Sequence, residues 1–257
     1  MVYFDAMRRL AIKPGAIGDI VVSLPALEHL RCEYLEVWTT SRAVPLIGFA
    51  DRVRAISTTG LDLLGITAPS PQLLEELRSF DSIISWYGTS RPEFHDATAG
   101  MPVTFLPALP AASCAVHATD FYLQQVGAPA GAIPRIEVRA VREGYAVIHP
   151  FSGSARKNWP LEKFQRLAEK LPMPVRWCAG DEDPPLVDAV RIAGLLDLAR
   201  WLAGAGLYIG NDSGITHLAA AVGTPTLAIF VASNPRIWAP RGDHVRIAVS
   251  GAVAQLP

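Results

Sequence analysis

Polar residues interrupt an apolar part of the chain at YIGNDSGITHLAAAVGTPT, residues 208–226. Asp212 or Ser213 is placed to cap the helix expected to follow, and the first N–H groups of that helix would be free to bind an anion. Asp212 would repel an adjacent phosphate, so its carboxylate is expected to accept from a capping N–H or a sugar hydroxyl. His217 lies on the same helix face as Ser213, although a lone histidine there is also consistent with a structural role.

A second polar loop, with the sequence HPFSGSARKNWP, follows the strand-like stretch YAVIHP. Ser152, Gly153, Ser154 and a nearby lysine, Lys157, together offer hydroxyl and backbone donors beside a point charge, which suits an anion site. A solvated basic loop is the alternative.

A third loop, IKPGAIGD, lies near the start of the chain and is followed by a predicted helix through Leu24, Leu27 and Leu30. Gly15 and Gly18 allow a tight backbone path, and Asp19 stands at the beginning of the helix. This carboxylate could cap the helix, or it could act as a general base toward a substrate hydroxyl. The chain contains no complete dinucleotide or P-loop fingerprint.

Asp181, Glu182 and Asp183 form an Asp-x-Asp pattern of the kind that holds a divalent metal in some transferases. Pro184 and Pro185 follow directly, which favours an exposed acidic loop instead. The sequence also lacks the His-Glu-x-x-His and Gly-x-Ser-x-Gly motifs, which argues against metalloprotease and serine-hydrolase functions.

These loops must be positioned by strands, and eight apolar stretches of strand length recur along the chain with helical patterns between them. They are RRLAIK, LEVWTT, DSIISWY, YAVIHP, PVRWCAG, GLYIG, TLAIFV and HVRIAV. This alternation predicts parallel sheets of the α/β class. We interpret residues 126–144, which are rich in Gly, Pro and Ala at their start, as a linker between domains 1–140 and 141–257; a surface loop within one sheet is the alternative.

The 257-residue chain is globular in composition, with half of its residues hydrophobic and 18% charged. A formal net charge of −1 gives no support to a nucleic-acid partner. Three widely spaced cysteines indicate neither a zinc site nor a disulfide framework, so a reducing cytoplasm is expected. No apolar run reaches the length of a membrane span and the start lacks a signal-peptide pattern, while peripheral contact with a membrane stays open.

Taken together, the loops resemble the bacterial heptosyltransferases, glycosyltransferase family nine. The resemblance rests on GDIVVSLPALEHLR, HPFSGSARKNWPLEKFQRLA and GLYIGNDSGITHLAAAVGTPTLAIF followed by NPRIWAP, and weaker matches extend it over most of the chain. It implies a GT-B architecture, with two Rossmann-like domains facing a central cleft. It also implies an inverting transfer that needs no metal or other cofactor, typically from ADP-heptose to a lipid-linked acceptor in the lipopolysaccharide core, at the inner face of the cytoplasmic membrane.

Carried over by position, the resemblance assigns Asp19 as the catalytic base and Lys157 as the phosphate-binding lysine, and it makes residues 211–217 the floor of the donor site. The expected substrate-binding residues are Gly18, Ser152, Ser154, Lys157, Glu182, Asp212, Ser213, Gly214 and His217. Glu182 or Asp183 would take the place of a ribose-binding glutamate, and the C-terminal part is expected to be shortened. Two alternatives stay open: a nucleotide-sugar epimerase of the same architecture, and a non-catalytic protein that binds a sugar nucleotide or glycan.

Overall fold

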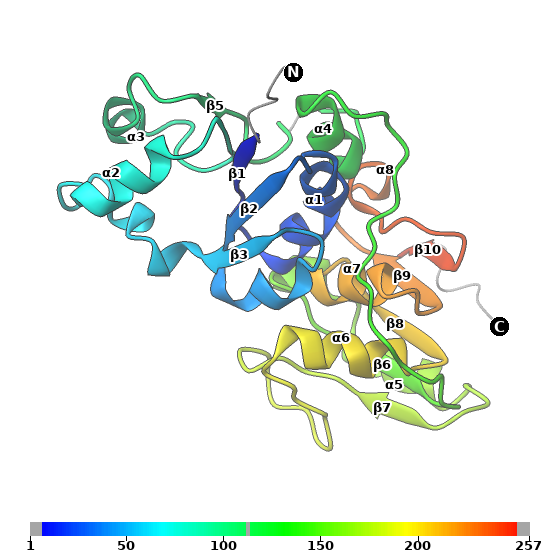
Figure 1. Ribbon diagram of the computed structural model, residues 1–257. Helices are drawn as coiled ribbons and strands as arrows, with labels where there is room; N and C mark the ends of the chain where they lie inside the picture. Colours follow the sequence, from blue (N-terminus) through cyan, green and yellow to red (C-terminus); the bar gives the residue numbers. More distant parts are fainter. Residues whose placement is uncertain (1–6, 112–113, 251–257) are drawn as a thin grey trace.

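A computed structural model describes residues 7–111 and 114–250 of the chain. In this part of the chain the strands form two five-stranded sheets, and every pairing within them is parallel. Figure 1 shows the first sheet toward the upper left and the second toward the lower right, with α1 and α7 between them. The α/β class is therefore confirmed.

The first sheet has the strand order β3-β2-β1-β4-β5. Its strands are β1 (Arg8–Ile12), β2 (Tyr34–Thr39), β3 (Arg52–Ala55), β4 (Ser82–Ser85) and β5 (Val103–Phe105). The second sheet has the order β10-β9-β8-β6-β7. Its strands are β6 (Ala146–His149), β7 (Val175–Trp177), β8 (Leu207–Asn211), β9 (Thr226–Phe230) and β10 (Val245–Val249).

All eight stretches predicted as strands form strands. The two strands that the sequence did not indicate, β3 and β5, lie at the edges of the first sheet, are short and contain no fully buried residue. Central strands differ because helices cover both of their faces: every residue of β6 is buried, which produces the continuous apolar run expected of a parallel sheet.

Helices connect the strands in sequence. They are α1 (Ile17–His29), α2 (Pro71–Arg78), α3 (Pro92–Ala97), α4 (Ala118–Gln125), α5 (Leu161–Ala168), α6 (Leu195–Ala203), α7 (Gly214–Ala221) and α8 (Pro235–Trp238). The short 3₁₀ helices are η1 (Ser41–Leu46), η2 (Ile56–Thr58), η3 (Leu61–Leu63) and η4 (Ala155–Lys157). Among the residues described, no helix is both long and apolar enough to cross a bilayer.

The segment between α4 and β6 contains no helix or strand, and it connects the two sheets. Ile136 anchors it: its side chain is buried, and its backbone N–H donates to the carbonyl of Ala221 at the end of α7 (2.9 Å). The segment therefore lies against the second domain, while the exact domain boundary at residues 140 and 141 stays a prediction.

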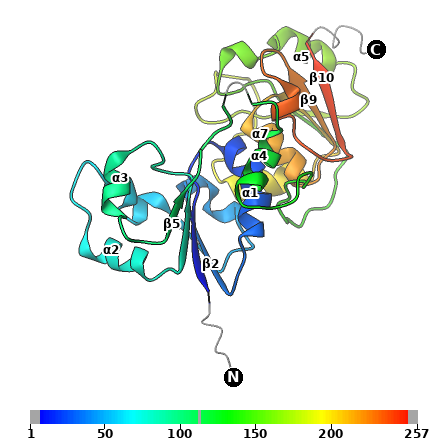
Figure 2. The ribbon, with the colours of Figure 1, turned by 90° about the horizontal axis from the view of Figure 1, so that it is seen from above.

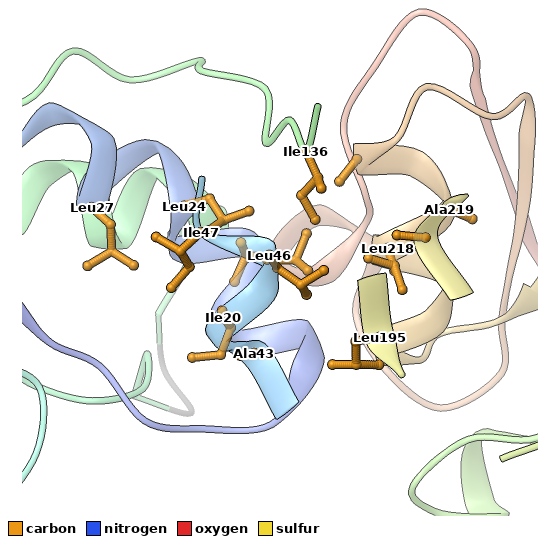
Figure 3. Packing of buried hydrophobic residues seen from close by; sticks show 14 of the residues in the cluster. Ile20, Leu24, Leu27, Ala43, Leu46, Ile47, Ile136, Leu195, Leu218 and Ala219 are labelled. Carbon is orange, nitrogen blue, oxygen red and sulfur yellow. The ribbon is translucent and has the colours of Figure 1, made fainter. Parts of the chain in front are cut away.

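Helices α1 and α7 contact each other and bring the two domains together. Figure 2 shows α1, α4 and α7 gathered between the strands of the first sheet and those of the second. Leu24 and Leu27 of α1, Leu46 of η1, Leu195 of α6 and Leu218 of α7 belong to one cluster of buried apolar side chains (Figure 3). The two sheets thus share a core.

Polar contacts reinforce the domain interface on one side. Arg241, which follows α8, forms a two-pronged ion pair with Asp120 of α4 and also donates to the carbonyl of Ala132 (3.2 Å). His117 caps α4 through Nδ1, and its Nε2 lies 2.8 Å from the carbonyl oxygen of Ala239. These contacts tie α4 to the segment that follows α8.

Candidate active site

A cleft of about 740 Å³ lies between the two domains. Its walls come from the loops after β1 and β2 of the first sheet and after β6, β7 and β8 of the second. These are carboxyl ends of parallel strands, where ligands gather in open α/β sheets. Its volume is in the range that holds a small organic ligand.

Asp19 lies on the N-terminal wall as the third residue of α1. Ala16 occupies the N-cap position, and no side chain caps the helix. Within the described chain the Asp19 carboxylate makes no side-chain hydrogen bond, so the interpretation of Asp19 as a helix cap is not supported. A carboxylate free of protein partners, at the wall of a cleft, is available to accept a proton from a bound hydroxyl.

Lys13 lies behind this wall and was not singled out by the sequence. Its side chain is only 1% exposed, and its Nζ is 4.9 Å from the centre of the Tyr122 ring. Burial lowers the pKa of Lys13 to about 8, although the negative charge of Asp19 opposes the shift. The same two causes, burial and the charge of Asp19, raise the pKa of Tyr122. Asp19, Lys13 and Tyr122 therefore form one electrostatic cluster.

Lys157 and Asp212 meet on the opposite wall. Lys157 is the last residue of η4, and its Nζ lies 2.8 Å from Oδ2 of Asp212. Lys157 is 39% exposed whereas Asp212 is 6% exposed, so the ammonium stands between the buried carboxylate and the cleft. Ser233, which the sequence did not indicate, also donates to Oδ2 of Asp212. The pair presents a positively charged group to the cleft.

Helix α7 begins at the same wall. Ser213 is its N-cap and accepts a hydrogen bond from the N–H of Thr216 (3.4 Å), which confirms the predicted capping site. His217 is buried, with Nε2 3.9 Å from Oδ1 of Asp212. Desolvation by burial lowers the pKa of His217, so its imidazole is neutral near pH 7. The helix terminus and a neutral imidazole thus lie beside the Lys157–Asp212 pair.

Two residues of the segment 211–217, Asn211 and Thr216, are not among those that line the cleft. Asn211 is fully buried; its Oδ1 accepts from the N–H of Trp159 (2.8 Å), and its Nδ2 donates to the carbonyl of Pro150 (2.7 Å). The Thr216 hydroxyl is also fully buried and donates to the carbonyl of Asn211. These side chains fix the loops after β6 and β8 and do not line the cleft.

Ser152 and Ser154 differ in position. Ser152 lines the cleft, and its Oγ lies 2.8 Å from the carbonyl oxygen of Ser154 and 2.7 Å from Oδ1 of Asn158. Ser154 is not among the lining residues and serves as the N-cap of η4. Only Ser152 is therefore brought to the cleft together with Lys157.

The acidic loop after β7 lines the cleft through Asp181, Glu182 and Asp183. Glu182 is exposed, whereas Oδ2 of Asp183 accepts from the N–H of Gly180 (2.6 Å) and lies 2.9 Å from Nε2 of His149. The His149 hydrogen bond is the main cause that lowers the pKa of Asp183. Asp183 is thus the anchored carboxylate of the loop. Over residues 7–111 and 114–250, no group of three His, Cys, Asp or Glu side chains has the arrangement of a metal site.

Gly18 of α1 and Gly214 of α7 lie against each other beside the cleft, where the two domains meet. A Cβ on Gly214 would lie 2.9 Å from Cβ of Ile17 and 3.0 Å from the backbone nitrogen of Gly18. The two helices can therefore pack at this distance only without a side chain at residue 214.

Gly214→Ala is accordingly expected to lower the free energy of unfolding by about 1–3 kcal/mol, the usual cost of overpacking against backbone. Chemical denaturation measures this. Gly48→Ala is the matched control, since a Cβ there would have no neighbour within 4 Å. Equal stability of the two variants would contradict the described helix contact.

Comparison with known proteins supplies the family. The model of glycosyltransferase family 9, the heptosyltransferases, matches residues 109–256, which is more than half of the chain. The chain belongs to glycosyltransferase family 9. The resemblance predicted from the three loops is thereby confirmed.

Two curated members of the family are similar to this family 9 protein in sequence. Lipopolysaccharide heptosyltransferase 1 of Pseudomonas aeruginosa is 29% identical over 150 residues, which cover 58% of this chain and 34% of that protein. Lipopolysaccharide heptosyltransferase 3 of Escherichia coli is 27% identical over 140 residues, which cover 48% of this chain and 41% of that protein. The chain thus spans between a third and about two fifths of the length of these curated relatives.

Solved structures give the fold. E. coli heptosyltransferase WaaC with ADP has a TM-score of 0.69 at 17% identity, covering 97% of this chain and 96% of that one. E. coli ADP-heptose lipopolysaccharide heptosyltransferase II has a TM-score of 0.71 at 16% identity, covering 97% and 95%. These likenesses confirm the GT-B architecture predicted for this family 9 protein.

Proposed function

We propose that this protein is a glycosyltransferase that moves a sugar from a nucleotide-diphosphate donor to a hydroxyl group of a saccharide acceptor. One observation carries the proposal: a single cleft has a free carboxylate, Asp19, on one wall and the Lys157 ammonium with the N-terminus of α7 on the other. Glycosyl transfer needs a base for the incoming hydroxyl and positive potential for the departing diphosphate.

The donor is assigned to the C-terminal wall. The backbone N–H groups at the start of α7 and the Lys157 ammonium both favour a diphosphate. Before the donor binds, Asp212 holds Lys157 in place through their 2.8 Å contact. Ser152, Gly214 and His217 border the same space. The carboxylates of Glu182 and Asp183 are assigned to hydroxyl groups of the donor, with Asp183 the better anchored of the two.

The acceptor is assigned to the N-terminal wall, where Gly18 and Asp19 line the cleft. Asp19 removes the proton of the acceptor hydroxyl as its oxygen bonds to the anomeric carbon of the donor sugar. The bond from that carbon to the phosphate oxygen breaks, and the electron pair leaves with the nucleoside diphosphate. Attack from the wall opposite the leaving group inverts the anomeric centre. Holding both substrates in one cleft supplies the orientation that the reaction requires.

The relatives suggest the substrates. Two of them are named lipopolysaccharide heptosyltransferases, and a structure of E. coli WaaC is described with ADP-2-deoxy-2-fluoro heptose. We therefore assign ADP-heptose as the donor and a lipid-linked saccharide of the lipopolysaccharide core as the acceptor. A lipid-linked acceptor would bring the protein to the inner face of the cytoplasmic membrane as a peripheral enzyme.

The function is tested by incubating the protein with ADP-heptose and a lipopolysaccharide inner-core saccharide in EDTA, with mass analysis of the products. The expected result is an acceptor heavier by one heptose together with free ADP, and added magnesium should leave the rate unchanged. Activity that EDTA abolishes and magnesium or manganese restores would overturn the metal-independent mechanism. A parallel thermal-shift measurement with ADP-heptose is expected to raise the unfolding temperature, since the ligand binds the native state. Donor binding without transfer to any acceptor would favour a non-catalytic binding protein.

A further inference from the structure

Lys13 occupies a position that the fold fixes tightly. It directly follows β1; its backbone N–H donates to the carbonyl of Trp38 (2.9 Å), and its own carbonyl accepts from Oγ1 of Thr39 (2.8 Å). The side chain runs inward instead of into solvent, with 1% of its surface exposed. The position of its Nζ is therefore set by the sheet and by the Tyr122 ring beside it.

The Lys13 ammonium has three N–H donors and few partners. Among the described residues it makes one long hydrogen bond, to the carbonyl of Pro14 at 3.5 Å, and no ion pair. Burying a charged group with so few partners costs stability, and a methionine of similar length would avoid this cost. A residue that is unfavourable for folding and lies beside a cleft is a candidate for function.

Lys13 and Asp19 both lie close to the point that a side chain on Gly15 would occupy. The point that a Cβ on Gly15 would occupy lies 3.5 Å from Nζ of Lys13 and 3.6 Å from Oδ2 of Asp19. The nearest other atom to this point is Cβ of Asp19, at 3.3 Å. Gly15 and Asp19 both line the cleft, so this point lies at its edge, with the Lys13 ammonium directly behind the lining residues.

The two charged groups lie more than 4.0 Å and at most about 7 Å apart, a range that includes the separation one bridging oxygen can span. Lys13 and Asp19 are not in ion-pair contact, and the upper limit follows from their two distances to the shared point. An oxygen that hydrogen-bonds to both at about 2.8 Å spans up to about 5.6 Å. A hydroxyl there can accept from the ammonium and donate to the carboxylate at the same time.

We propose that Lys13 is a second catalytic residue, whose ammonium donates a hydrogen bond to the attacking oxygen of the acceptor while the same hydroxyl donates its proton to Asp19. This inference rests on the proposed glycosyl transfer. The O–H bond breaks, its proton passes to Oδ2 of Asp19, and the oxygen forms the new bond to the anomeric carbon. Lys13 keeps its proton throughout.

The effect of Lys13 arises in the transition state. Negative charge develops on the acceptor oxygen as its proton leaves, and a buried ammonium stabilises that charge without having to reorient. Removing one such donor typically lowers turnover about 10²–10³-fold. The donor nucleotide contacts the opposite wall, so its affinity should not depend on Lys13.

Lys13→Met tests the proposal. The matched control is Lys170→Met, at an exposed residue just after the end of α5. Turnover is measured with ADP-heptose and a lipopolysaccharide inner-core saccharide at saturation, donor affinity by calorimetry, and stability by thermal unfolding. The expected Lys13→Met protein turns over about 10²–10³-fold more slowly, binds ADP-heptose as the wild type does, and unfolds at the same or a higher temperature. Lys170→Met should match the wild type in all three.

The possible failures can be told apart. A wild-type protein that transfers no sugar overturns the proposed function and this inference together. An active wild type with a Lys13→Met variant that retains more than about a tenth of its turnover overturns this inference alone. A loss of donor affinity as large as the loss of turnover also overturns it, because Lys13 would then act through the domain arrangement.

Gly15→Ala provides a second, independent variant in case Lys13→Met does not fold. Its methyl group would stand between Lys13 and Asp19, 3.3 Å from Cβ of Asp19. Because Gly15 has a φ of +158°, the substitution also strains the backbone, so thermal unfolding is measured beside turnover. Transfer should decrease strongly while ADP-heptose affinity is retained. Wild-type turnover in Gly15→Ala would contradict a substrate hydroxyl at this point.

Discussion

Asp19→Asn should leave a folded protein that binds ADP-heptose normally and transfers sugar about 10²–10⁴-fold more slowly than the wild type. An amide cannot take the proton of the acceptor hydroxyl, so the base is lost while the size of the side chain is retained. Because Asp19 makes no side-chain hydrogen bond in the described part of the chain, the substitution breaks none and removes only the attraction between its charge and Lys13. Steady-state turnover together with donor calorimetry measures both effects.

Asp197→Asn is the matched control for this experiment. Asp197 is the third residue of α6, as Asp19 is of α1. Its side chain is exposed to solvent and pairs with Arg200. Both substitutions remove a carboxylate from the first turn of a helix, so their effects on the helix dipole are alike. An Asp19→Asn protein with more than about a tenth of wild-type turnover would falsify the assignment of Asp19 as the base.

Lys157→Ala is expected to weaken ADP-heptose binding by about 2 kcal/mol, or roughly 30-fold in Kd. This is the lower end of the usual range for removing one partner of a charge pair, because Lys157 is partly exposed. The same change removes the ion-pair partner of the buried Asp212 carboxylate and leaves it with the Ser233 hydroxyl and the neutral imidazole of His217, so the free protein should also lose stability. Calorimetry and chemical denaturation separate the two effects.

A double variant, Lys157→Ala with Asp212→Asn, separates the effect on stability from the effect on donor binding. The double variant no longer buries an unpaired carboxylate, so it should regain stability without regaining donor affinity. Lys163→Ala, on the exposed surface of α5, controls for the general loss of a positive charge. Unchanged donor affinity in a folded Lys157→Ala protein would exclude a contact between Lys157 and the diphosphate.

The fold and the place of the site followed from the sequence because both depend on local patterns. Buried parallel strands appear as continuous apolar runs, and polar loops after three such runs must meet at the same end of their sheets. This reasoning singled out the loops of Asp19, Lys157 and Ser213, and the resemblance to the heptosyltransferases predicted that they face one cleft. The edge strands β3 and β5 were not predicted, because their residues are partly exposed and form no apolar run.

The roles of individual side chains depended on contacts that no local pattern records. A lysine at the end of a strand normally extends into water, but Lys13 is buried, with its Nζ beside the ring of Tyr122 from a helix far along the chain. Asn211 reads as a polar residue of the binding loop, but its partners are the backbone groups of Pro150 and Trp159. Such assignments require the tertiary structure.

The core that the two sheets share limits how substrates can enter and leave. Leu24 of α1 and Leu218 of α7 are both buried in it, so swinging the domains apart about a hinge would expose apolar surface from both sides to water. The Arg241–Asp120 pair and the contact between His117 and Ala239 would have to break as well. Substrate exchange is therefore expected to take place through the open mouth of the cleft, by small loop movements, with the domains remaining closed together throughout the catalytic cycle.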